Sequence, residues 1–140
     1  MMTTIEEALE GSTPLAEKVR AGGSYDSTAE VIARMRAVLP TLSDAERVAT
    51  LNAHPRIGED PGRLSTRSLQ EQGADGLAEL ARLNAEYERR FGFRFVVFVN
   101  RRSKAEILEV LRGRLQRSRK DELEEGLRAI VDIAADRLAG

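Results

Sequence analysis

The sequence predicts an all-α protein, with one bundle-like domain of about eight helices over residues 1–140. Three observations favour this class. The helix-capping pattern Ser/Thr-x-x-Glu marks five expected helix starts, apolar residues recur at helical spacing, and glycine or proline stands where the helices are expected to end. One apolar segment, residues 93–100, breaks the helical pattern and predicts a buried extended or irregular connector.

Most expected helices begin at a recognisable cap. In each capping pattern the hydroxyl accepts a hydrogen bond from a free backbone N–H, and the glutamate reaches back to the N–H of the cap residue. Thr13-Pro14 adds another start, because proline suits the first helical position. The capping patterns are Thr4/Glu7, Ser27/Glu30, Ser43/Glu46, Ser68/Glu71 and Ser103/Glu106. The expected helices cover residues 4–10, 14–20, 28–38, 44–53, 69–73, 76–91, 104–117 and 121–138.

Apolar stripes give these helices a face to bury. The stripes comprise Val31, Ile32, Met35, Val38 and Leu39; Leu80, Leu83, Tyr87 and Phe91; Ile107, Leu108, Leu111 and Leu115; and Leu123, Leu127, Ile130, Val131, Ala134 and Leu138. Expected stops are Gly11, Gly22-Gly23, Pro40 and Gly92. The helices therefore form one core, and short polar turns connect them.

The segment Phe93–Val99 is β-branched and aromatic, which favours a strand. No other segment has the character of a partner strand, and a single strand cannot satisfy its backbone. The segment holds three of the four phenylalanines. We therefore expect a connector that crosses the core between helices.

Composition excludes several classes of function. With 22 Lys+Arg and 23 Asp+Glu, the net charge is −1, which argues against nucleic-acid or anionic-membrane binding. The absence of cysteine excludes disulfides, thiolate metal sites and cysteine nucleophiles, and one histidine excludes a multi-histidine zinc site within the chain. The longest apolar run, Phe95–Val99, is too short to span a membrane. Since Met1–Gly11 lacks the basic start of a signal peptide, we expect a cytoplasmic protein.

A basic cluster near the last helix has a structural interpretation. It comprises Arg112, Arg114, Arg117, Arg119 and Lys120. Four acidic residues follow at once, and no aromatic residues are interleaved for base stacking. We therefore expect a solvated, salt-bridged junction between two helices.

Two residues stand out as candidates for acid–base chemistry. His54 is the one side chain whose unperturbed pKa lies near neutrality, and Pro55 ends the preceding helix there. His54 is either a helix-end residue that interacts with the dipole or a catalytic group. Glu71 is either the partner of Ser68 in a capping box or a carboxylate at a helix N-terminus, where free N–H groups and Gln72 could bind an anion.

These elements together resemble the 2-oxo-4-hydroxy-4-carboxy-5-ureidoimidazoline (OHCU) decarboxylase family. The resemblance covers about Glu7 to Leu138. It depends on Leu51-Asn52-Ala53-His54-Pro55-Arg56-Ile57-Gly58-Glu59, then Ser68-x-x-Glu71-Gln72, then Leu83-Asn84-x-x-Tyr87-x-x-Arg90-Phe91-Gly92-Phe93-x-Phe95-Val96, and Ile133-Ala134-x-x-Arg137-Leu138. Each element is weak alone, but the set is specific.

The resemblance implies an all-helical, homodimeric decarboxylase that forms (S)-allantoin in urate degradation, with a small-molecule substrate and no metal or other cofactor. It implies His54 as general acid and Glu71 as its carboxylate partner. The implied substrate contacts are Pro55, Ser68, Gln72, Arg137 and the backbone of Phe95, Val96, Val97, Phe98 and Val99. Arg137 is alternatively a surface residue favoured by the helix dipole. Two other functions fit the sequence: a non-catalytic helical interaction domain, and a decarboxylase of a related ureido or hydantoin-like acid.

Overall fold

The computed structural model describes the backbone of residues 4–57 and 66–139, and the side chains of residues 4–57 and 78–139. Every regular element in this part of the chain is helical, which confirms the predicted class. The elements are α1 (Ile5–Ala8), α2 (Pro14–Ala21), α3 (Thr28–Val38), the short 3-10 helix η1 (Leu39–Thr41), α4 (Asp44–Asn52), α5 (Thr66–Phe91), α6 (Lys104–Arg114) and α7 (Arg119–Ala139). None of these helices is long and apolar enough to cross a membrane.

Side-chain caps start the helices as predicted. In five cases the hydroxyl accepts from the backbone N–H three residues on, at Thr4, Thr13, Ser27, Ser43 and Ser103. Reciprocal bonds complete the capping boxes at α4 and α6. Glu30 departs from the predicted pattern, because its carboxylate accepts from the N–H of Asp26 at 2.7 Å and not from the cap residue.

The region 69–91 contradicts the predicted boundaries. The two expected helices, 69–73 and 76–91, are one continuous helix, α5, so the chain has seven α-helices in its described part. Gly73 and Gly76 do not break the helix, because each internal glycine costs only about 1 kcal/mol and most other residues of α5 are good helix formers. Ser68 therefore lies within the first turn of α5 and is not its cap residue.

The junction before α7 also differs from the prediction. Helix α6 ends at Arg114 rather than 117, and α7 begins at Arg119 rather than 121. Ser118 accepts a hydrogen bond from the N–H of Asp121 at 3.1 Å. This is a serine cap with aspartate in the place of glutamate, so the pattern Ser/Thr-x-x-Glu does not include it.

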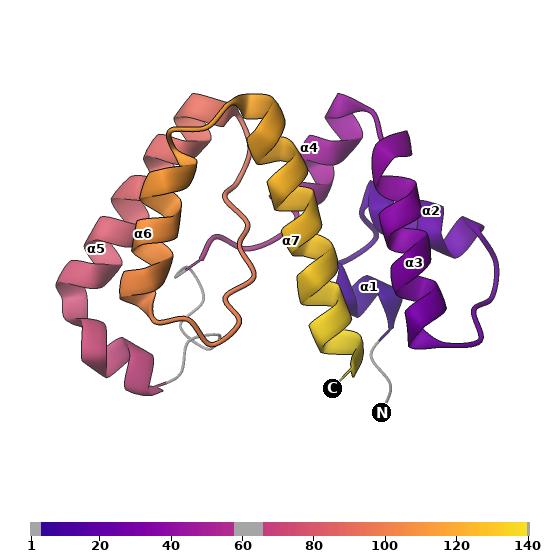
Figure 1. Ribbon diagram of the computed structural model, residues 1–140, viewed down its shortest axis with the longest axis horizontal. Helices are drawn as coiled ribbons and strands as arrows, with labels where there is room; N and C mark the ends of the chain where they lie inside the picture. The colour runs from indigo at the N-terminus through magenta and orange to yellow at the C-terminus, as the bar shows by residue number, and fades with distance from the viewer. Residues whose placement is uncertain (1–3, 58–65, 140) are drawn as a thin grey trace.

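Helix α7 lies at the centre of the molecule, between the α5–α6 pair and the group formed by α1, α2 and α3 (Figure 1). It packs against α1, α3 and α4, while α5 packs against α6. Its apolar stripe is buried as predicted, at Leu123, Leu127, Ile130, Val131 and Ala134. At Gly126 the contact with α4 is close: a Cβ there would lie 2.8 Å from Cδ2 of Leu51.

The connector after α5 runs between the α5–α6 pair and α7 (Figure 1). It is extended without a partner strand in the described part of the chain, as predicted. Phe93 and Phe95 are buried and pack against Tyr87 of α5, with ring centroids 6.0 and 5.3 Å apart. These aromatic contacts join the connector to α5.

Candidate functional site

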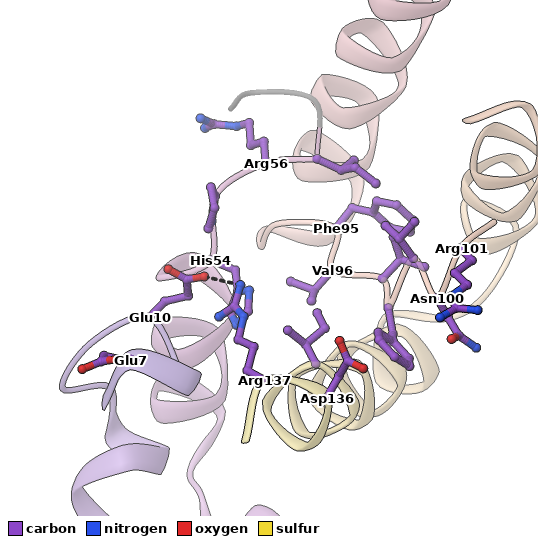
Figure 2. Close-up of a pocket in the computed structure, with 16 residues that line it drawn as sticks. Glu7, Glu10, His54, Arg56, Phe95, Val96, Asn100, Arg101, Asp136 and Arg137 are labelled. Carbon is purple, nitrogen blue, oxygen red and sulfur yellow. Dashed lines mark ion pairs between the residues drawn. The ribbon is translucent and has the colours of Figure 1, made fainter. Parts of the chain in front are cut away.

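A cavity of about 710 Å³ opens where the connector meets α7, the end of α4 and the end of α1 (Figure 2). The predicted site residues in its wall are His54, Pro55, Phe95, Val96, Val97, Phe98, Val99 and Arg137. Side chains from four distant parts of the sequence therefore meet at one small-molecule-sized hollow.

His54 lies at the corner that follows α4. Helix α4 ends at Asn52, as expected shortly before Pro55, because the residue that precedes a proline disfavours helical geometry. His54 is only 4% exposed. The connector supports this corner at two points. Arg94 donates through its guanidinium to the carbonyl of His54 at 2.8 Å and through its backbone N–H to Asn52 Oδ1 at 3.0 Å.

The corner is also joined to α5. Arg56 forms two hydrogen bonds with the carboxylate of Glu88, at 2.6 and 3.0 Å. Asn84 Nδ2 donates to the carbonyl of Ile57 at 3.1 Å. The backbone around His54 is therefore held from both the connector and α5.

Arg137 lies in the cavity wall near the end of α7, with 27% of its side chain exposed. Its Nη2 lies 2.7 Å from a carboxylate oxygen of Glu10, an ion pair drawn in Figure 2. Its Nη1 donates to the carbonyl of Ala8 at 3.1 Å. Two groups of the N-terminal segment thus fix the guanidinium.

Glu10 lines the cavity but was not among the predicted site residues. Its backbone has a positive φ, as do two other residues of the cavity wall. Glu10, Asn100 and Arg101 have φ of 64°, 45° and 66°, and in the described part of the chain they are the non-glycine residues with positive φ. Each such residue costs of order 1–3 kcal/mol, and such strain gathers at functional sites. A single sequence carries no signal for the pairing of Glu10 with Arg137, because it depends on the packing of α1 against α7.

Three predicted site residues have side chains outside the described part of the chain: Ser68, Glu71 and Gln72. Their backbone lies in the first two turns of α5. These three residues therefore lie on a helix, and their contacts with substrate stay predictions.

The basic cluster differs from its prediction at one residue. Arg114 is not solvated: its side chain is 8% exposed and pairs at 2.7 Å with Glu122, which is fully buried. Arg119 agrees with the prediction, because it forms an exposed pair with Asp44. Arg114 turns inward because Glu122 and the connector lie beneath it, a tertiary arrangement that local charge patterning does not reveal.

The fold is all-α, and its pocket carries a buried histidine and an arginine that is paired with a carboxylate. The family described as OHCU decarboxylase matches residues 1–139. The chain belongs to this family.

Individual relatives agree with this assignment. The chain is 31% identical over 137 residues to the uric acid degradation bifunctional protein of Bacillus sp. strain TB-90, covering 92% of this chain and 27% of that protein. It therefore spans about a quarter of that longer relative. It is 30% identical over 141 residues to the 2-oxo-4-hydroxy-4-carboxy-5-ureidoimidazoline decarboxylase of Haloferax volcanii, covering 95% of this chain and 83% of that protein.

A solved structure has the same fold. The crystal structure of OHCU decarboxylase in the presence of (S)-allantoin superposes with a TM-score of 0.79 at 27% identity, covering 91% of this chain and 89% of that one.

Proposed function

We propose that this chain decarboxylates 2-oxo-4-hydroxy-4-carboxy-5-ureidoimidazoline to (S)-allantoin in urate degradation, with His54 as general acid and Glu71 as its carboxylate partner. One observation carries the proposal: His54, Arg137 and the connector backbone line the same cavity although they come from distant parts of the sequence. Membership of the decarboxylase family supports the same reaction.

The chemistry makes modest demands on the protein. The bond between the hydroxyl-bearing carbon and the carboxylate breaks, CO2 leaves, and the electron pair forms a double bond to the neighbouring carbon while the imine nitrogen of the substrate takes up a proton from solvent. The hydroxyl then becomes a carbonyl as the neighbouring carbon gains a proton. Because the substrate supplies its own electron sink, the protein has to orient the carboxylate, accept the hydroxyl proton and deliver a proton to one face.

His54 suits the delivery of that proton. A histidine titrates near neutral pH, and a well-placed acid contributes about 10²–10⁴-fold to the rate. Delivery from one side of the cavity sets the stereochemistry of the product. Arg56 and Asn84 join the His54 corner to α5, the helix on which the proposed partner Glu71 lies.

Arg137 and the connector supply groups that bind oxygen atoms. A guanidinium holds a carboxylate through two parallel hydrogen bonds. The backbone N–H groups of Phe95–Val99 donate to no other residue of the described part of the chain. Such preorganised donors stabilise negative charge as it develops on a substrate oxygen.

The test generates the unstable substrate from urate with the two preceding enzymes of the route. Circular dichroism then follows whether allantoin appears faster with the purified protein and as one enantiomer. Acceleration with formation of (S)-allantoin is the expected result. A folded protein that leaves the uncatalysed rate and the racemic product unchanged would instead favour a helical interaction domain.

We also propose one domain over residues 1–140, a homodimer and a cytoplasmic location. The family match over residues 1–139 supports the single domain. Light scattering coupled to size-exclusion chromatography tests the dimer, because a monomer mass at micromolar concentration would contradict it.

A further inference from the structure

We infer that Arg114, held by Glu122 and Tyr87, is a positioning residue that fixes the connector backbone for substrate binding. This inference rests on the proposed function, since it assigns the connector N–H groups to the substrate. It concerns three residues that do not line the cavity. They act on it through the connector.

Arg114 reaches the connector directly. Its Nη1 donates to the carbonyl of Val96 at 2.8 Å, and its guanidinium carbon lies 4.7 Å from the ring centroid of Phe95. Both Phe95 and Val96 line the cavity. One side chain of α6 therefore contacts the backbone and the aromatic anchor of the same cavity-lining segment.

A buried carboxylate fixes Arg114 in turn. Glu122 Oε1 accepts from Arg114 Nε at 2.7 Å and from the Tyr87 hydroxyl at 2.7 Å. The other oxygen of Glu122 lies 3.2 Å from Arg117 Nη1. Because a buried charge without its partner is strongly unfavourable, the guanidinium has little freedom to leave this position.

A second arginine, Arg102, also binds backbone carbonyls, at the other end of the connector. Arg102 donates to the carbonyl of Phe98 through Nη2 and to that of Val99 through Nε. The two arginines thus bind backbone carbonyls of a connector that has no partner strand among the described residues.

This arrangement fixes where the connector N–H groups point. In a planar trans peptide the C=O and the following N–H point in opposite directions. Since the carbonyls of Val96 and Phe98 face Arg114 and Arg102, the N–H groups of Val97 and Val99 face away from these arginines. Val97 and Val99 both lie in the cavity wall, so these N–H groups are the donors we assign to substrate oxygens.

The variant Arg114→Lys tests this role. An ammonium keeps the charge opposite Glu122 but cannot present the fixed planar fork that serves Glu122 and Val96 together. We expect kcat/KM to fall at least tenfold, mainly through KM, with the pH dependence of kcat unchanged because His54 is untouched. The affinity for the product (S)-allantoin, measured by calorimetry, should fall in parallel.

Arg119→Lys is a matched control. Arg119 also donates to a backbone carbonyl, that of Phe91 at 3.2 Å, pairs with the carboxylate of Asp44 and lies over the ring of Phe93. In the described part of the chain none of these three partners lines the cavity, so the same loss of the guanidinium fork should leave KM and product affinity at parent values. Equal kinetic effects in the two variants, or none in Arg114→Lys, would overturn the inference.

Two further measurements keep the inference testable. If Arg114→Lys does not fold, Tyr87→Phe keeps the ion pair while it removes one bond to Glu122, and it should raise KM in the same direction by a few fold; a parent-like KM would overturn the inference. If the parent protein does not turn over the substrate, the proposed function fails on its own. Backbone NMR order parameters then decide: lower values at Val97 and Val99 in Arg114→Lys than in Arg119→Lys support the positioning role, and equal values refute it.

Discussion

Arg137 owes its position in the cavity wall to the N-terminal segment. Glu10 neutralises one side of the guanidinium and the carbonyl of Ala8 accepts from it, so the side chain is already oriented before any ligand binds. Such preorganisation reduces the entropy that binding has to overcome. The positive φ of Glu10 shows that the backbone accepts local strain to deliver this carboxylate.

Replacing the arginine by lysine tests whether it holds substrate. Arg137→Lys keeps the charge near Glu10, so the melting temperature should barely change. A lysine offers no planar fork, so we expect KM to rise clearly while the pH dependence of kcat stays at the parent position. Steady-state kinetics across pH measure both quantities. Parent kinetics would remove Arg137 from the substrate site.

His54→Asn tests the general acid. The substitution should leave the protein folded, with a loss of no more than about 2 kcal/mol, the upper range for a histidine at a helix end. Turnover should fall by about 10²–10⁴-fold, because the acid is gone. The stereospecific appearance of allantoin measures this loss. If the variant converts substrate at the parent rate, another group donates the proton.

Glu71→Gln tests the carboxylate partner. Because Ser68 lies inside α5, the alternative of a capping box at this helix start is wrong. Glutamine keeps the size and nearly the helix propensity of glutamate, so the melting temperature should stay near the parent value while turnover is lost. Glu46→Gln, in the capping box of α4, is the control that should retain activity. Parent-like turnover in Glu71→Gln would make this residue structural.

At the scale of the elements, caps are the most readable part of the sequence. A side-chain oxygen and the N–H three residues on are neighbours in the chain, so a local pattern contains the whole interaction, as at Ser43 and Ser103. The continuity of α5 was not predicted, because Gly73 is a residue at which helices often end, and whether a helix tolerates it depends on the other residues of the helix. Local patterns therefore predict helix starts better than helix continuity.

The candidate site was predictable only in part. His54, Pro55, the connector and Arg137 belong to short motifs, and the structure brings them to one cavity. Glu10 and Arg114 could not be found, because each acts through a partner far away in the sequence, Arg137 and Val96 respectively. Pairings of this kind are fixed by helix packing, which a single sequence does not display.

The capping box of α6 should make the melting temperature of the protein sensitive to acid. The backbone N–H of Ser103 lowers the pKa of Glu106 below its ordinary value of 4.5. The stabilisation is therefore complete above about pH 4.5 and is lost as the pH falls through the lower folded-state pKa. Glu106→Gln should lose less melting temperature than the parent between about pH 6 and about pH 3. Glu124→Gln, on the exposed face of α7, should follow the parent. A parental acid response in Glu106→Gln would contradict this assignment.

At the scale of the whole molecule, α7 holds the parts of the site together. It packs against α1, which carries the partner of Arg137, and against α4, which ends at the His54 corner. The close approach at Gly126 allows α4 to lie directly on α7. The relative placement of His54 and Arg137 thus depends in part on the packing of α1 and α4 against α7.

Two glycine substitutions separate packing from helix propensity. Gly126→Ala gains about 1 kcal/mol of propensity but forces the buried Leu51 to move, and overpacking costs about 1–3 kcal/mol. We expect a lower melting temperature for it. Gly113→Ala, in α6, meets no atom within 4 Å and should gain up to about 1 kcal/mol. Thermal unfolding of both variants measures the two melting temperatures. A stabilised Gly126→Ala would mean that the α4–α7 contact accommodates a methyl group without strain.

The composition of the connector also predicts what happens to the protein when it unfolds on heating. Residues 93–99 are apolar, β-prone and free of proline, and they carry a single charge, a composition typical of segments that assemble into amyloid-like stacks once exposed. In the folded chain Arg114 and Arg102 occupy three of the segment's backbone carbonyls, which are the acceptors that another copy would need for intermolecular pairing. When heating unfolds the chain around the connector, those acceptors and the phenylalanines become available together. Loss of the folded protein at high temperature should therefore occur by aggregation, faster in concentrated solution and not reversed by cooling.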